Sequence, residues 1–266
     1  MRFILETSLS NVWMTKICII FCASTLYLMP LKAQSLLDNA QQRFPRVANA
    51  FKYKEDSLKK QFEDAGLKWP AKQLYLRNFK YDSQLEVWVR NKKDEQFILF
   101  KTYKVCALSG VLGPKRMEGD YQVPEGFYYV NELNPKSKYH LSLGLNYPNA
   151  ADRVNSKKVN PGGEIYIHGT CSTVGCIPIQ NDQVEELYVL ATLAQQAGQQ
   201  FIPVHIFPVK FGSEKNTAVL KKAYELNTTY PIFVNKLKEV YDYFESTKKL
   251  PLISINKNGV YQLVGR

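Results

Sequence analysis

Ile165-Tyr-Ile-His168-Gly-Thr-Cys171-Ser-Thr-Val-Gly175-Cys176-Ile-Pro-Ile179 is the stretch of sequence that decides the fold. Its β-branched run predicts a short strand that ends at His168, and a loop of small residues then leads to a Gly-Cys pair. A cysteine thiol becomes a good nucleophile when a nearby imidazole takes its proton. The stretch therefore indicates either a catalytic cysteine–histidine pair or a plain strand–loop junction with a buried cysteine.

The overall composition is that of a soluble globular protein. The chain has 266 residues, of which 45% are hydrophobic and 22% charged, so it can bury a full core. Its formal charge of +11 favours anionic partners, such as nucleic acid, a membrane surface or an acidic wall polymer. Lysine and arginine never occur in runs longer than two, and no nucleic-acid-binding motif is present. We therefore expect no nucleic-acid partner.

The first 33 residues have the pattern of a secretory signal peptide. Lys16 precedes an apolar run from Ile17 to Met29, and Pro30 and Ala33 follow at a plausible cleavage point. The run is too short to span a bilayer comfortably, although an uncleaved membrane anchor is the alternative. We predict export, with no integral membrane segment after signal removal, to a periplasmic or cell-wall-associated location.

Export also changes what the cysteines imply. Cys18 and Cys22 leave with the signal, so Cys106, Cys171 and Cys176 remain. In an oxidising compartment an odd number suggests one disulfide and one free thiol. If Cys176 is the working thiol, Cys106 and Cys171 are the candidates to pair.

Periodicity predicts a helix, then a series of strands, then a mixed tail. Residues 35–68 have helical spacing that Pro45 interrupts. Alternating polarity predicts strands near residues 73–77, 85–90, 96–106, 122–130, 139–146 and 200–207.

Two further segments complete these expectations. Residues 148–163 are expected to form a long loop ahead of the His168 strand. Asp182 and Glu185 are spaced as a capping box for a helix that ends at Gly198. The tail has helical patterns at 218–226 and 232–244 and short strands at 252–255 and 260–264.

A metal centre is a weaker interpretation of the same residues. His168, Cys171 and Cys176 could be zinc ligands, but the sequence has no Cys-x-x-Cys pair or second close histidine, and structural zinc needs four ligands. His140 and His205 lie between apolar neighbours, which is typical of structural histidines. We predict no metal and no cofactor.

Several ordered motifs resemble those of one family. His168-Gly169 followed by Thr173-Val174-Gly175-Cys176 resembles the signature of the L,D-transpeptidase catalytic domain (YkuD-type) family, and more narrowly its YafK-like branch. Cys106-Ala-Leu-Ser-Gly, Gly113-Pro-Lys, Val123-Pro-Glu-Gly and Pro203-Val-His-Ile-Phe-Pro208 resemble that branch in the same order. The likeness extends from about Gln73 to Phe211.

The resemblance implies a fold and a domain organisation. We expect a mainly β (α+β) protein whose L,D-transpeptidase-type sheet or sandwich carries an N-terminal helix and a C-terminal extension of helices and a β-hairpin. The predicted parts are a signal peptide (1–33), an N-terminal helical segment (34–70), an L,D-transpeptidase-like catalytic domain (71–211) and a C-terminal extension (212–266).

The resemblance also implies chemistry on peptidoglycan stem peptides. Cys176 would attack a stem carbonyl to form a thioester, with His168 as the base that takes the thiol proton. An amine of a second stem would then give a cross-link or exchange, whereas water would trim the stem or release a cell-wall-linked protein. Gly175, Gly169 and Thr173 would support the loop and the oxyanion that forms.

Two departures from the family pattern leave substrate binding open. Val174 stands where many members have histidine, and Pro178 stands where many have arginine or asparagine. Candidate substrate-binding residues are Lys115, Arg116, Arg153 and Tyr166. The rival to an enzyme is a non-catalytic cell-wall-binding module, and a metal-dependent hydrolase is a third option.

The cysteine assignment makes a direct prediction. Thiol titration of the mature protein, denatured without reductant, should find one reactive thiol, because Cys106 and Cys171 would be joined in a disulfide. Three reactive thiols would contradict the assignment.

Overall fold

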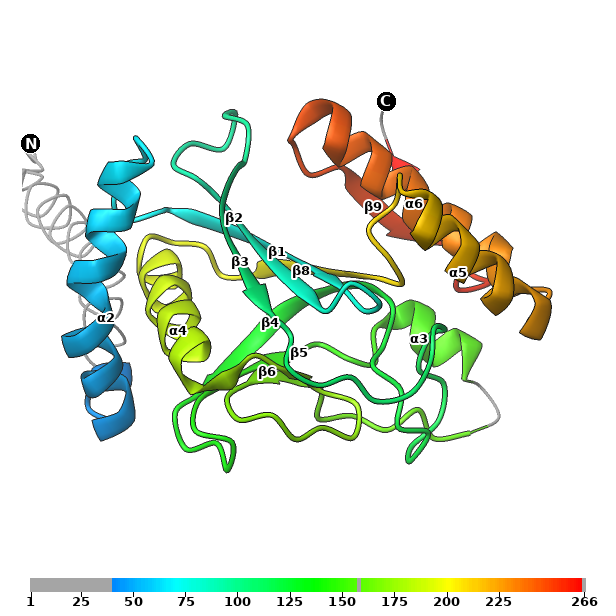
Figure 1. Cartoon of the computed structure of the whole chain (residues 1–266), viewed down its shortest axis with the longest axis horizontal. Coiled ribbons are helices and arrows are strands. Elements are labelled where there is room, and N and C mark those ends of the chain that lie inside the picture. The colour runs from blue at the N-terminus through cyan, green and yellow to red at the C-terminus, as the bar shows by residue number, and fades with distance from the viewer. Residues whose placement is uncertain (1–39, 157–158, 265–266) are drawn as a thin grey trace, which may run out of the picture. The chain divides into compact units, whose positions relative to one another are not determined.

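The structure is a computed structural model that describes residues 40–156 and 159–264 (Figure 1). The predicted signal peptide, residues 1–33, lies outside the described residues, as does the start of the helix expected from residue 35. Residues Gln41–Arg266 form one compact unit. Among the described residues, no helix is long and apolar enough to cross a lipid bilayer.

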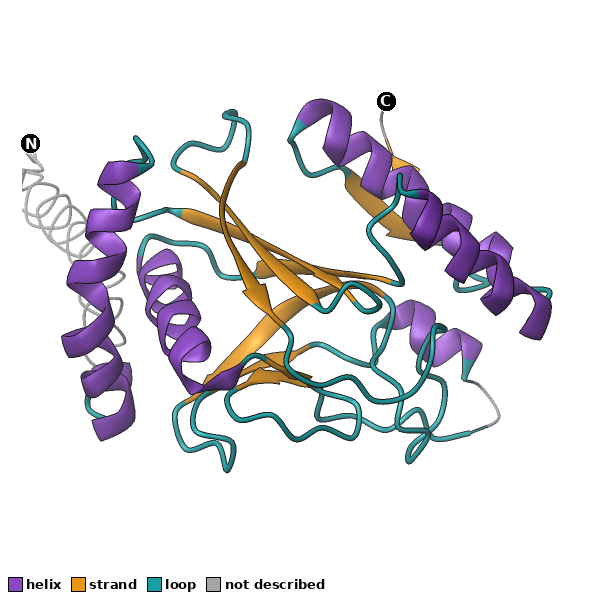
Figure 2. Cartoon of the chain, in the orientation of Figure 1, coloured by secondary structure: helices purple, strands orange, loops and turns teal. Residues whose placement is uncertain are grey.

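A twisted sheet forms the centre of this unit (Figure 2). Within the described residues it has eight strands in the order β3-β2-β1-β8-β4-β5-β6-β7. The β1–β8 and β6–β7 pairs are parallel and the other neighbours are antiparallel. The strands are β1 (Gln73–Phe79), β2 (Gln84–Arg90), β3 (Ile98–Lys104), β4 (Gly126–Asn134), β5 (Ser142–Leu145), β6 (Tyr166–His168), β7 (Ile177–Pro178) and β8 (Ile202–Phe207).

Helices and a hairpin complete the architecture, which confirms the α+β fold class predicted from the sequence. In Figure 1, α2 and α4 lie on one side of the central strands, and α5 and α6 lie on the other with the hairpin. The elements are α2 (Pro45–Asp64), α3 (Ala150–Asn155), α4 (Gln180–Gln196), α5 (Glu214–Leu226) and α6 (Tyr230–Thr247), with β9 (Leu252–Ile255) and β10 (Tyr261–Val264).

Both faces of β1 are buried, because each is covered by different helices. Leu74 and Leu76 belong to the core cluster that includes residues of α2 and α4. Tyr75 points the other way and packs against Phe244 of α6, with ring centroids 4.8 Å apart. Burying each large apolar side chain contributes roughly 1.5–3 kcal/mol. The C-terminal extension therefore supplies the second face of the core.

Two local expectations were wrong. The segment expected to be a loop contains α3, which begins because Asn149 and Asp152 form a capping box. Asp182 and Glu185 do not form one, because α4 already begins at Gln180 and its N-cap, Ile179, has no side-chain acceptor. Both carboxylates have other partners.

Lys80 and Glu125 form a fully buried ion pair below the loop that follows β3. The Lys80 ammonium shares its three protons among four acceptors, Glu125 Oε1 at 3.0 Å and the carbonyl oxygens of Val111, Gly113 and Val123, each at 2.9 Å. Glu125 accepts from Gly113 N at 2.7 Å and from the hydroxyl of Tyr230, at the start of α6, at 2.8 Å. Burial lowers the pKa of Lys80, and Glu125 opposes that shift. One ion pair thus joins β1, the loop and the C-terminal extension.

Removing one member of this pair should destabilise the fold strongly. We expect Lys80→Met to lower the free energy of unfolding by about 3–5 kcal/mol, because Glu125 is left as an unpaired buried charge. Urea denaturation measures the change. Lys238→Met, which breaks the exposed Lys238–Asp242 pair, is the control and should cost less than about 1 kcal/mol. Equally small losses of unfolding free energy in both variants would show that the buried pair contributes no more to stability than an exposed pair.

Candidate active site

The register of two short strands brings the predicted site residues onto one face. Ile167 pairs with Ile177 and His168 with Pro178, so Cys176, just before β7, lies beside Tyr166. The Tyr166 N–H donates to Cys176 Sγ at 3.4 Å. Because side chains alternate along a strand, Tyr166, His168 and Cys176 share a face of the sheet.

The tautomer of His168 follows from its hydrogen bond. Its Nδ1 is hydrogen-bonded to the carbonyl oxygen of Gly169, and a carbonyl can only accept, so Nδ1 carries the proton. Nε2 is then left with the lone pair that a base needs. The ring is only 1% exposed and stacks on Tyr139, with centroids 4.6 Å apart. Burial lowers the pKa of His168 from its usual 6.5, so the ring is neutral at neutral pH.

Cys176 is the free cysteine of the described residues, and it is half-buried. Its thiol donates to the Glu164 carbonyl oxygen at 3.6 Å. Burial raises the pKa of the thiol above that of an ordinary cysteine. The Tyr166 N–H opposes this shift, Glu164 adds to it and Lys115 opposes it. Across the described part of the chain, no hydrogen bond joins this thiol to the His168 ring. In this state both groups are therefore neutral and separate.

A disulfide braces the loop between His168 and Cys176. It joins Cys106 to Cys171. The loop leaves β6 through Gly169, where a Cβ would come within 2.5 Å of Asn181 Oδ1 and 2.8 Å of the Tyr139 carbonyl oxygen. Only glycine fits that turn, so Gly169 supports the loop by its small size.

Thr173 and Gly175 shape the approach to the thiol. The Gly175 N–H donates to Thr173 Oγ1 at 3.0 Å, and the Thr173 hydroxyl donates to the Cys176 carbonyl oxygen at 2.8 Å. Gly175 has a φ of 142°, which favours glycine. Among the described residues the Cys176 N–H has no acceptor. It is therefore the donor available to an oxyanion, whereas the Gly175 N–H is engaged.

A groove of about 260 Å³ opens at Cys176. Lys115 lies in its wall, where its ammonium donates to Asp120 Oδ1 at 2.6 Å and to the Met117 carbonyl oxygen at 2.9 Å. His168 does not line the groove. The groove is lined by Lys115, Glu118, Gly119, Tyr121, Gly162, Gly163, Glu164, Ile165, Val174, Gly175 and Cys176.

The other candidate binding residues lie in different places. Tyr166 adjoins the thiol through its backbone, and its pKa is raised to about 12 by burial and by a hydrogen bond to Glu132. Arg116 is paired with Asp152, at 3.2 Å, and lines a different pocket. Arg153 is exposed on the last turn of α3, outside the groove.

Sequence reasoning missed three neighbours of the site. The Tyr139 ring stacks on the His168 ring. Glu132 is hydrogen-bonded to the Tyr166 side chain, and the Glu164 carbonyl oxygen accepts a hydrogen bond from the Cys176 thiol. Glu132 reaches Tyr166 across Gly144, because β4, β5 and β6 are adjacent and Gly144 has no side chain to separate them. No sequence motif marks these residues. Within the described residues no group of three His, Cys, Asp or Glu side chains is placed to hold a metal ion.

Comparison with known proteins gives a family match over the same residues. The family model described as the L,D-transpeptidase catalytic domain matches residues 80–210. The protein named "Putative L,D-transpeptidase YafK" from Escherichia coli (strain K12) is 37% identical over 190 residues, which is 71% of this chain and 72% of that protein. The protein of the same name from Escherichia coli O157:H7 gives the same values.

Two solved structures are similar at lower identity. The helical cell shape determining protein Pgp2 from Campylobacter jejuni is 21% identical, with 75% of this chain and 80% of that chain covered and a TM-score of 0.41. Bd1075 from Bdellovibrio bacteriovorus is 22% identical, with 65% and 63% covered and a TM-score of 0.36. Both TM-scores lie below 0.5, so these similarities add nothing to the family match.

The resting protonation state of the thiol can be measured directly. The rate of Cys176 alkylation by iodoacetamide should rise with pH through a midpoint higher than that of the denatured protein, because burial raises the pKa of the thiol. The denatured protein is the control and should show the midpoint of an ordinary cysteine. A midpoint below neutral pH in the folded protein would mean a resting thiolate–imidazolium pair and would contradict this account.

Proposed function

The chain belongs to the L,D-transpeptidase catalytic domain family, and on that basis we propose that it is an exported, cysteine-dependent L,D-transpeptidase of peptidoglycan stem peptides. One observation carries the proposal. The free thiol of Cys176 and the ring of His168 lie on one face of adjacent strands, and the His168 tautomer leaves Nε2 as a base.

The proposed reaction begins when the Cys176 side chain rotates from the Glu164 carbonyl toward His168. Nε2 takes the thiol proton, and the sulfur attacks the carbonyl carbon of the bond to the terminal D-amino acid. The carbonyl oxygen becomes an oxyanion that the Cys176 N–H can stabilise. When the intermediate collapses, the C–N bond breaks, His168 returns the proton to the leaving amine, and a thioester remains on Cys176.

The second half of the reaction regenerates the enzyme. An amine of a second stem attacks the thioester and loses its proton to Nε2, which gives a cross-linked or exchanged stem and a free thiol. Water can take the place of the amine, and the product is then a shortened stem or a protein released from the wall. Cys176 faces an open groove, so both acceptors can reach it. This hydrolytic reaction is our alternative.

The exposed carboxylates of the groove suit a peptide substrate that carries an ammonium group. The backbone carbonyl of Glu164 lies at the thiol, and the side chains of Glu118 and Glu164 are exposed and line the same groove as Lys115. Carboxylates attract the ammonium group of a diamino acid, and an ammonium attracts a stem carboxylate. The groove thus offers exposed negative charge, whereas the buried Lys115 ammonium is already paired with Asp120.

Two features support an exported, wall-associated location. Residues 1–33 have the signal-peptide pattern, and Cys106 and Cys171 form a disulfide. Disulfides persist in oxidising compartments such as the bacterial periplasm. The basic formal charge of +11 suits contact with an acidic polymer.

Incubation with defined muropeptides, with products read by mass spectrometry, tests the function. The parent protein should remove a terminal D-amino acid, form a dimer or release a linked peptide. We expect Cys176→Ala to abolish turnover, and His168→Gln to lower kcat by about 10²–10⁴-fold, because general base catalysis contributes that much.

A matched histidine variant is the control for this experiment. His140 bonds Glu185 at 2.7 Å, away from the groove, and His140→Asn should retain turnover. Unchanged turnover in Cys176→Ala would overturn the cysteine mechanism. Binding of sacculi without any thiol-dependent product would favour the non-catalytic wall-binding module.

A further inference from the structure

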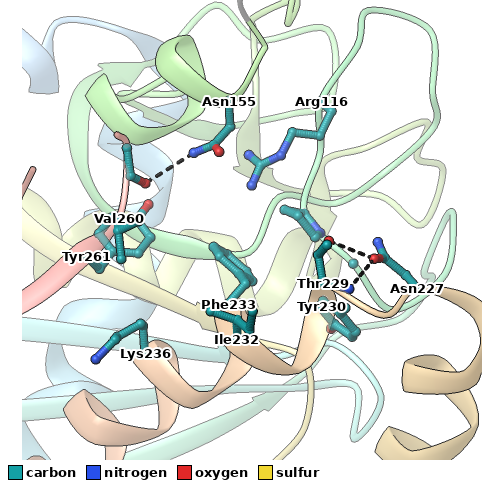
Figure 3. Close-up of a pocket in the computed structure, with 13 residues that line it drawn as sticks. Arg116, Asn155, Asn227, Thr229, Tyr230, Ile232, Phe233, Lys236, Val260 and Tyr261 are labelled. Carbon is teal, nitrogen blue, oxygen red and sulfur yellow. Dashed lines mark hydrogen bonds between the residues drawn. The ribbon is translucent and has the colours of Figure 1, made fainter. Parts of the chain in front are cut away.

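A second pocket, of about 410 Å³, lies where the C-terminal extension meets the loop after β3 (Figure 3). Arg116 comes from that loop, Asn155 from α3, Phe233 from α6, and Gly259 and Val260 from the turn between β9 and β10. None of the proposed catalytic residues lines it. It is therefore a separate cavity that no step of the proposed reaction uses.

Two consecutive residues of the loop after β3 line different sites, one the groove at Cys176 and the other the second pocket. Lys115 lines the groove at Cys176, whereas Arg116 lines the second pocket. The buried Lys80 ammonium holds this loop through the carbonyl oxygens of Val111 and Gly113. A single anchored segment thus forms part of the wall of both the groove and the pocket.

Arg116 presents unused donors to the pocket. Nη1 donates to Asp152 Oδ1 at 3.2 Å and weakly to the Lys115 carbonyl oxygen at 3.4 Å. Nε and Nη2 have no acceptor among the described residues. In Figure 3 the guanidinium extends into the pocket, and its Cζ lies 5.6 Å from the centroid of the Phe233 ring. A carboxylate could bind this edge of the guanidinium with two hydrogen bonds.

The rest of the pocket is apolar or neutral apart from one further cation. Phe233 and the 65% exposed Ile232 offer apolar surface, and Lys236 adds a positive charge. No Asp or Glu side chain is among the described residues that line it. The Asn155 Nδ2 group donates to the Gly259 carbonyl oxygen at 3.1 Å, which holds the hairpin turn against α3. This hydrogen bond thus joins two of the elements that form the pocket wall.

We propose that this pocket is a second subsite, which binds a carboxylate of a peptidoglycan fragment through Arg116 and packs its attached apolar surface on Phe233 and Ile232. The choice of ligand class rests on the proposed function, whereas the site itself rests on the pocket residues. Such a subsite would hold a part of the wall polymer beyond the bond that reacts at Cys176.

Titrations monitored by NMR of the isoleucine, leucine and valine methyl groups test the proposal on the mature protein. The probes are N-acetylmuramic acid, whose carboxylate is on a sugar, an L-Ala-D-Glu-diaminopimelate tripeptide, whose carboxylates are on a peptide, and neutral N-acetylglucosamine. We expect at least one carboxylate probe to shift the Ile232 methyl signal, and which one does so identifies the source. N-acetylglucosamine should leave that signal unchanged.

Two variants locate the binding. Arg116→Gln should weaken binding of the carboxylate probe about tenfold, because the probe loses a charge-assisted hydrogen bond. Ile232→Trp keeps Arg116, fills the mouth of the pocket at an exposed position and should also weaken binding about tenfold. Because this variant has no Ile232 signal, its affinity is read from the methyl groups of Val260, which also line the pocket. The controls are Lys222→Gln and Leu226→Trp, exposed positions on α5 outside the pocket, which should leave the affinity unchanged.

The outcomes separate this inference from the proposed function. If no probe shifts Ile232, or if both variants bind as the parent does, the subsite is wrong even when Cys176→Ala abolishes turnover. If Cys176→Ala keeps turnover, the cysteine mechanism is wrong, but the NMR shifts still report on the pocket. Equal effects of neutral and acidic sugars would also overturn the role of the carboxylate.

Discussion

The buried Lys80 ammonium is the constraint on which the rest of the structure depends. Moving a charge out of water costs several kcal/mol unless other groups replace its hydration, and here three carbonyl oxygens and Glu125 do so. Those carbonyl oxygens belong to the loop after β3, which is thereby held against β1. Since Glu125 also accepts from Tyr230, the same charge holds the start of α6. A loop without regular structure gains a fixed position.

The fixed loop after β3 connects the core to the groove at Cys176 and to the second pocket. Lys115 extends into the groove at Cys176, where its charge opposes the rise in the thiol pKa, and Arg116 extends into the pocket beside α6. The Cys106–Cys171 disulfide joins this same loop, near its start after β3, to the loop that carries Thr173 and Gly175. The thiol therefore lies between two braced loops, and pre-organisation of this kind reduces the entropy lost when a flexible substrate binds.

Burial also explains the resting state of the candidate pair. It lowers the pKa of His168 and raises that of Cys176, so both shifts favour the neutral forms. A neutral imidazole can accept a proton, and a neutral thiol resists oxidation, because oxidants react with the thiolate.

The sequence by itself determined the α+β class and the family, because the motif spacing in His168-Gly169 and Gly175-Cys176 is local. The catalytic roles of His168 and Cys176 are a prediction from the same motif. The sequence did not predict α3, because the residues around the capping box of Asn149 and Asp152 favour a loop. Nor could it show that Arg116 and Lys115 face different hollows, or that Tyr139 covers His168. Those placements depend on the register of β4, β5, β6 and β7 and on Lys80, which join residues far apart in the chain. Only the tertiary structure decides them, because the energy of a buried charge or a packed face depends on all its neighbours at once.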